Sequence, residues 1–107
     1  NNSTLTGFEN HGGRTYLGSH TAPLARVRVG HGNNSEDGTE GAVVDSAIGT
    51  YLHGSVLPKN PHLADHLIAS ALARVAPGAP MVPLNDEVEW AAHRSALRVA
   101  GVGKRDA

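Results

Sequence analysis

The chain contains no cysteine. This excludes disulfide bonds, thiolate metal sites and a cysteine nucleophile supplied by these residues themselves. Nine basic residues nearly balance ten acidic ones, so the basic excess typical of nucleic-acid-binding domains is missing. No apolar run approaches the ~18 residues that a membrane-spanning helix needs, and the polar residues 1–4 do not resemble a signal peptide. We therefore expect a cytoplasmic protein with no nucleic-acid partner and no membrane-spanning segment.

Aromatic side chains are also scarce and make up only 4% of the chain. A core of small aliphatic residues suits helices packed closely on a sheet. It serves a small free-standing domain less well, because large aromatic side chains usually supply much of the buried area there. The first residue is Asn1 rather than Met, so we expect a processed chain or a part of a longer protein. We interpret residues 1–107 as a single partial domain.

The first half of the chain has the patterns of short strands. Alternating or β-branched segments that predict strands occupy residues 3–9, 23–29, 42–44 and 47–52. Between them, residues 30–41 are polar and rich in glycine, which predicts a loop, and within it residues 30–34 are interpreted as a flexible surface turn. These strands need more sheet to complete a fold, which again indicates the tail of a larger α/β domain.

Two helices are predicted after the strands. Asn60 is suited to cap the first and Pro61 to its opening turn, and an apolar stripe then recurs at helical spacing as far as Val75. The prolines of residues 76–84 exclude a helix there. Residues 85–87 supply a cap and an acidic first turn for the second helix. The predicted fold class is therefore α/β, and the packing of the connector and C-terminal helix, residues 76–107, stays open.

The stretch with the clearest bearing on chemistry is residues 50–54, where His53 follows a predicted strand and precedes Gly54. Open α/β sheets build their active sites at the C-terminal ends of strands. An imidazole there could take a proton from a nucleophile or deliver one to a leaving group. A histidine at the end of a strand is more often an ordinary surface residue than a catalytic one, so the interpretation depends on the surrounding motifs.

Three motifs in order resemble a known family. Residues 49–54 (GTYLHG) resemble the histidine motif of the cobyric-acid-synthase-like class I glutamine amidotransferases, and residues 7–15 (GFENHGGRT) resemble a second motif of that group. Residues 57–65 (LPKNPHLAD) resemble one subgroup, the amidotransferase subunit of lipid II isoglutaminyl synthase. The resemblance covers roughly residues 5–72 and implies the C-terminal portion of a flavodoxin-like class I glutamine amidotransferase domain.

The resemblance also implies a reaction and a partner. A cysteine on a strand-to-helix elbow attacks the side-chain amide of glutamine, while His53 takes the thiol proton and passes it to the departing ammonia. The ammonia then goes to a synthetase that resembles a Mur ligase and uses ATP and Mg to activate the D-glutamate carboxylate of lipid II. We expect no cofactor in this chain, and no glutaminase activity from the chain by itself, because the cysteine is missing.

Further site residues are predicted around this histidine. Many class I amidotransferases have a glutamate two residues after the histidine, but here that position is Ser55. Glu9 is a candidate orienting acid, and a hydrogen bond from Glu9 to a loop backbone is the alternative. His11 could line the glutamine pocket with Gly12 and Gly13, whose flexibility lets the chain approach a ligand. The alternative for His11 is a structural role in a turn.

The other histidines predict no metal site. His62 and His66 lie four residues apart on the first helix, but no third ligand is evident, which favours a solvated helix face. His20, His31 and His93 have no recognisable partners and are predicted to lie on the surface.

Two other functions stay open. The first is the amidotransferase domain of a cobyric acid synthase, which keeps the chemistry and amidates a corrinoid. The second is a non-catalytic interaction module that binds a ligase partner without hydrolysing glutamine.

Overall fold

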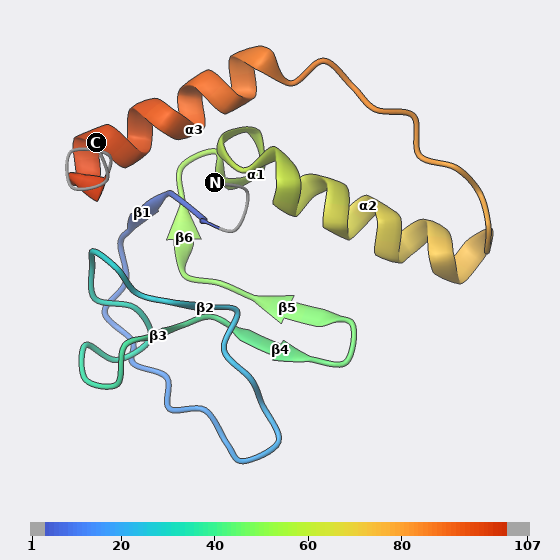
Figure 1. Ribbon diagram of the computed structural model, residues 1–107. Helices are drawn as coiled ribbons and strands as arrows, with labels where there is room; N and C mark the ends of the chain where they lie inside the picture. Colours follow the sequence, from blue (N-terminus) through green and yellow to red (C-terminus); the bar gives the residue numbers. More distant parts are fainter. Residues whose placement is uncertain (1–3, 103–107) are drawn as a thin grey trace.

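The computed structural model describes residues 4–102, which form short strands followed by helices (Figure 1). This agrees with the predicted α/β class. The strands form three antiparallel pairs, β1 with β6, β2 with β3 and β4 with β5. Their bounds are Phe8–Glu9 (β1), Ala25–Arg26 (β2), Thr39–Glu40 (β3), Ala42–Val44 (β4), Ala47–Gly49 (β5) and Leu52–His53 (β6).

Most strands are shorter than the sequence predicts. Only β1 forms within the predicted strand 3–9, whose first residue lies outside the described part of the chain, and only β2 forms within 23–29. The prediction at 42–44 is confirmed by β4. Ladder bonds form only where a second strand lies alongside, and each strand here has a single short partner. The predicted strand 47–52 accordingly divides into β5 and β6.

Both predicted helices are present as α2 (Pro61–Val75) and α3 (Glu87–Ala100). A third helix, α1 (Val56–Lys59), was not predicted. It begins directly after Gly54 and Ser55, which both adopt left-handed backbone conformations with φ of 70° and 58°. Two such residues in succession reverse the chain sharply at the end of β6, so the polypeptide leaves the strand and enters α1 at once.

Asn60 occupies the N-cap position of α2 and Pro61 its first turn, as predicted, but the side chain of Asn60 makes no capping hydrogen bond. Its amide instead pairs with the backbone of Thr6, accepting from the Thr6 N–H at 2.8 Å and donating to the Thr6 carbonyl at 2.7 Å. It also donates to the Val56 carbonyl at 2.6 Å. Asn60 therefore fastens the segment before β1 to the junction of α1 and α2.

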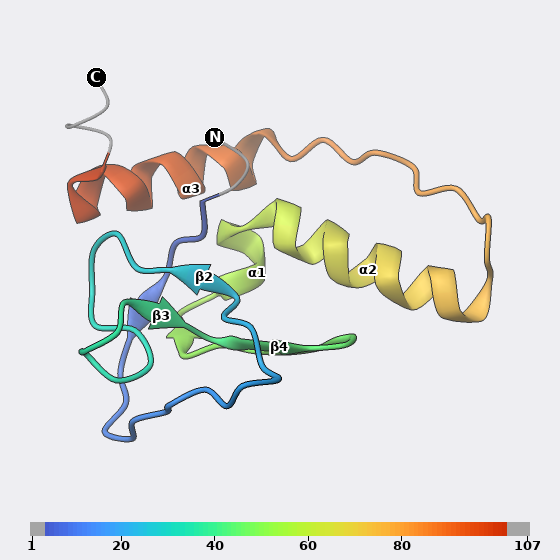
Figure 2. The same cartoon turned by 60° about the horizontal axis from the view of Figure 1, so that its bottom comes forward.

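The helices lie together on one side of the strands, and α3 crosses back over α1 (Figures 1 and 2). Among the described residues the buried apolar side chains are Pro61, Leu63 and Val102. The apolar stripe of α2 is otherwise largely open, with Ile68 49% and Val75 80% exposed. The expectation of helices packed on a sheet therefore fails for α2, because a two-stranded sheet offers no face as long as this helix. No helix within residues 4–102 has the length and hydrophobicity to span a membrane.

Candidate functional site

His53 is the last residue of β6 and its side chain is exposed. It pairs across the ladder with Phe8 of β1, and the two rings stack with centroids 5.9 Å apart. Gly54 follows with a positive φ, and a Cβ on Gly54 would overlap the Phe8 ring. The glycine thus lets the chain turn away beneath Phe8, which leaves the imidazole of His53 accessible at the strand end.

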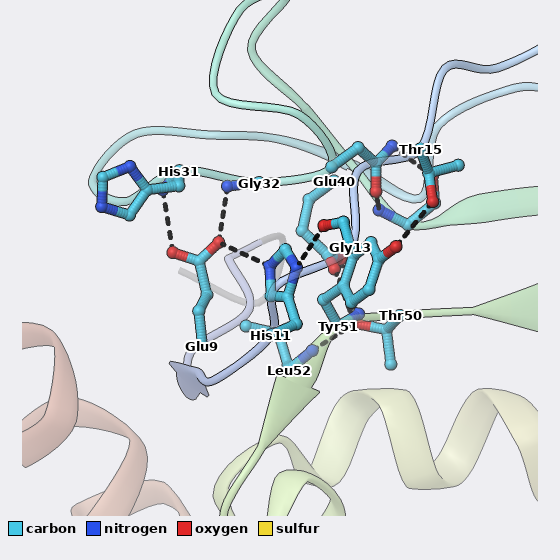
Figure 3. Close-up of polar contacts among 12 residues, drawn as sticks. Glu9, His11, Gly13, Thr15, His31, Gly32, Glu40, Thr50, Tyr51 and Leu52 are labelled. Atoms are coloured by element: carbon cyan, nitrogen blue, oxygen red, sulfur yellow. Dashed lines mark hydrogen bonds and ion pairs between the residues drawn. The ribbon is translucent and has the colours of Figure 1, made fainter.

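The carboxylate of Glu9 contacts a loop backbone. It accepts hydrogen bonds from the N–H groups of His31, at 2.8 Å, and Gly32 (Figure 3). Side chains of neighbouring strand residues point to opposite faces, and Phe8 of β1 is the residue that stacks on His53. This geometry favours the alternative stated for Glu9, a structural hydrogen bond, and its role as an orienting acid for His53 stays a prediction.

His11 is held in a turn and against an aromatic ring. Its Nδ1 donates to the carbonyl oxygen of Gly13 at 2.9 Å, and its Nε2 lies 4.0 Å from a Glu9 carboxylate oxygen. The imidazole stacks on the ring of Tyr51, with centroids 3.7 Å apart and planes at 11° (Figure 3). The Tyr51 hydroxyl in turn bonds Thr15 at 2.6 Å. His11 is therefore attached to the segment that leads into His53.

A polar cleft of about 410 Å³ opens beside this cluster. Apart from Gly12 and its two chain neighbours, no atom lies within 4 Å of the position that a Cβ on Gly12 would take, so the backbone there is free to approach a small molecule. Binding of glutamine by His11, Gly12 and Gly13 remains a prediction. The lining residues are Glu9, Asn10, His11, Gly12, Gly13, Arg14, His31, Asn33, Asn34 and Ser35. A larger groove of about 600 Å³, between β1, β2 and α3, includes neither His11 nor His53.

The loop at residues 30–41 is built around two buried asparagines, Asn33 and Asn34, so the prediction that residues 30–34 form a surface turn is wrong for these two residues. The Asn33 amide bonds both the N–H and the carbonyl of Gly41, at 2.8 and 3.0 Å. Asn34 donates to the Thr15 carbonyl and accepts from the N–H of Asp37. These bonds hold one wall of the cleft. Hydrogen bonds from Thr39 and Asn34 also lower the pKa of the Asp37 carboxyl.

Comparison with known proteins decides the family. The model of the CobB/CobQ-like glutamine amidotransferase domain matches residues 1–61. The chain belongs to this family. The matched residues include β1, the cleft and β6 with His53, so the family resemblance predicted from the three motifs is confirmed.

The most informative relatives are subunits of one enzyme. The chain is 47% identical over 88 residues to the lipid II isoglutaminyl synthase (glutamine-hydrolyzing) subunit GatD of Staphylococcus aureus, covering 80% of the chain and 35% of that protein. It is 44% identical over 71 residues to the GatD subunit of Streptococcus pneumoniae, covering 66% of the chain and 27% of that protein. A probable cobyric acid synthase of Methanothermobacter thermautotrophicus is 47% identical over 51 residues, 48% of the chain and 10% of that protein. The chain thus spans about a third of the length of the GatD relatives.

Outside the matched region, two histidines that were predicted to face solvent, His62 and His93, instead pack between the helices. His93 of α3 is only 1% exposed, and its Nδ1 donates to the Lys59 carbonyl at 2.8 Å. His62 of α2 donates through Nε2 to the Thr4 carbonyl and stacks on Trp90. Burial lowers the pKa of the His93 imidazole. His62 and His93 therefore fasten the helices together, whereas His20, His31 and His66 are exposed as predicted.

Proposed function

We propose that the full-length protein carrying this chain is a glutamine amidotransferase in which His53 is the proton carrier. The observation that supports this most directly is an accessible imidazole at the end of β6, inside the segment that matches the amidotransferase family. A polar cleft with an open glycine backbone lies next to the same strand connection, where His11 stacks on Tyr51. Together they offer a proton acceptor and a place for a small polar substrate.

The reaction balances with one further group, a cysteine outside these 107 residues. Its sulfur attacks the side-chain amide carbon of glutamine, and His53 takes the thiol proton. His53 then gives that proton to the departing nitrogen, so that ammonia leaves and a γ-glutamyl thioester remains. Water hydrolyses the thioester to glutamate and restores the thiol. An imidazole beside the thiol suits this chemistry, because it favours the nucleophilic thiolate.

We further infer that the ammonia serves the amidation of D-glutamate in lipid II. Support comes from the two GatD subunits, which align with 80% and 66% of this chain. On this proposal the chain works in the cytoplasm beside a Mur ligase-like synthetase, which supplies the ATP and Mg that activate the acceptor carboxylate. A cobyric acid synthase-type function is the second candidate, favoured by 41% identity over 91 residues to the cobyric acid synthase of Limosilactobacillus reuteri.

The test is glutamate release from glutamine by the full-length protein, with and without its synthetase. His53→Ala should lower the rate about 10²- to 10⁴-fold, as expected for loss of a general base. His20→Ala is the matched control, because His20 is an exposed histidine outside the cleft. Normal glutamate release by His53→Ala would rule out the proposed role. Amidation of lipid II, and not of a corrinoid, would separate the two candidate acceptors.

A further inference from the structure

The two residues that connect β5 to β6, Thr50 and Tyr51, lie outside every strand, yet hydrogen bonds to Glu40 and Thr15 hold them. β5 ends at Gly49 and β6 begins at Leu52. The Thr50 hydroxyl donates to the carboxylate of Glu40, 3.0 Å from both oxygens, and the Tyr51 N–H donates to the same carboxylate at 2.7 Å (Figure 3). The Leu52 N–H donates to the Thr50 hydroxyl oxygen at 3.1 Å. Glu40 thus anchors two consecutive N–H groups, one directly and one through Thr50.

Glu40 is itself rigidly placed. It lies in β3, opposite Ala25 of β2, and its carbonyl accepts from the Leu24 N–H at 2.9 Å. The residue is only 6% exposed. A buried carboxylate is costly unless hydrogen bonds compensate for the lost water. Within residues 4–102, the hydrogen bonds to the Glu40 carboxylate come from Thr50 and Tyr51. The carboxylate is therefore committed to this one connection.

We propose that Glu40 is a positioning residue that sets the place of His53 through the backbone of residues 50–52. This inference rests on the proposed amidotransferase function. His53 comes two residues after Tyr51, whose N–H is anchored, and a strand advances about 3.3 Å per residue. A shift of this anchor is therefore carried directly to the imidazole. A misplacement of about 1 Å in a catalytic group can cost about 100-fold in rate.

The opposite side of the connection is also held, by Tyr51. Its ring stacks on His11 and its hydroxyl bonds Thr15, so the segment is clamped between β3 and the cleft. Loss of the Glu40 carboxylate would leave the Tyr51 N–H and the Thr50 hydroxyl without their acceptor while this second attachment remains. The expected result is a folded protein with a displaced His53, so kcat should fall more than the affinity for glutamine.

The experiment measures kcat and KM for glutamate release by the full-length protein. Glu40→Ala should lower kcat about 10- to 100-fold with KM changed by less than about 3-fold, the pattern of a defect in the reacting geometry. Glu40→Gln should recover most of the loss, because its amide oxygen can still accept from Tyr51 and its NH₂ can donate to Thr50. Glu87→Ala, at an exposed glutamate in the first turn of α3, is the matched control and should keep the wild-type kcat.

Thr50→Val adds a variant that keeps the side-chain shape and removes the hydroxyl. It should lower kcat, and its effect should not add to that of Glu40→Ala, because both changes break one chain of hydrogen bonds. If Glu40→Ala fails to fold, Thr50→Val and Glu40→Gln decide the question. Wild-type kcat in Thr50→Val, or equal losses in Glu40→Gln and Glu40→Ala, would overturn the positioning role.

The outcomes also separate this inference from the function on which it rests. If His53→Ala abolishes glutamate release while Glu40→Ala retains full kcat, the amidotransferase function stands and the role of Glu40 is rejected. If the wild-type protein releases no glutamate with its synthetase present, both are rejected together.

Discussion

The side chain of Asn60 should be among the most costly to remove from this chain. It is 0% exposed and makes three hydrogen bonds, to the N–H and carbonyl of Thr6 and to the carbonyl of Val56. Asn60→Ala leaves two buried polar groups, the Thr6 N–H and carbonyl, without this partner, and also removes the bond to the part-buried Val56 carbonyl. Each buried group costs about 1–3 kcal/mol, so we expect the free energy of unfolding to fall by at least about 2 kcal/mol.

Asn60→Asp gives a sharper form of the same prediction. One carboxylate oxygen can still accept from the Thr6 N–H, but the other would face the carbonyls of Thr6 and Val56, which cannot donate. Asn60→Asp should therefore be about as damaging as Asn60→Ala at neutral pH. Acidification should improve it relative to Asn60→Ala, because a protonated acid regains one donor.

Urea unfolding of the full-length protein, followed by circular dichroism, measures both effects. Asn85→Ala is the control, because the Asn85 side chain makes a single exposed bond to the N–H of Glu87, and its loss should cost about 1 kcal/mol. If Asn60→Ala were no more destabilising than Asn85→Ala, the buried pairing with Thr6 would not be what fastens β1 to the helices.

Two further predictions follow from the glycine after His53 and from the buried His93. Gly54→Ala should destabilise the protein by about 2–5 kcal/mol in urea unfolding, because it combines a left-handed φ with overlap of the Phe8 ring. Phe8→Ala in the same chain should relieve the overlap and leave the cost of the left-handed φ. If the losses of stability from Gly54→Ala and Phe8→Ala simply added in the double variant, this explanation would be contradicted. The folded-state pKa of His93 lies below its ordinary value of 6.5, so the unfolded chain binds more protons between the two values and stability rises with pH. The contribution of His93 to stability is complete above about pH 6.5 and is lost as pH falls through the folded-state pKa. His93→Asn, which keeps a donor towards the Lys59 carbonyl, should flatten this acid dependence of the melting temperature. An unchanged pH profile of the melting temperature would contradict the prediction.

The helices α2 and α3 could be predicted from the sequence because their signals are local, whereas the short α1 was not predicted. Pro61 opens α2, and the prolines after Val75 end it, within the reach of a few residues. Strand length could not be predicted in the same way. The patterns at residues 3–9 and 23–29 indicate strands, but the length of each depends on a partner elsewhere in the chain.

The buried polar residues were missed for a related reason. Asn60 and Thr6 are 54 residues apart, and an asparagine before a proline looks like a helix cap when only its neighbours are considered. Asn33 and Asn34 look like a solvated turn until Gly41 and Thr15 are brought beside them. His93 likewise shows nothing in its own helix that points to the carbonyl of Lys59. His53 was singled out because its motif is continuous in sequence, and its catalytic role stays a prediction.

The most direct test of the proposed function is the pH dependence of cysteine alkylation in the full-length protein. An imidazole beside the nucleophilic thiol should lower the thiol pKa, so iodoacetamide should react rapidly well below pH 8. His53→Ala should move the midpoint of the reaction up towards the ordinary thiol value of about 8.5, whereas His20→Ala should leave it unchanged. Identical profiles for the wild type and His53→Ala would show that His53 does not lie beside the cysteine, and would contradict its proposed role.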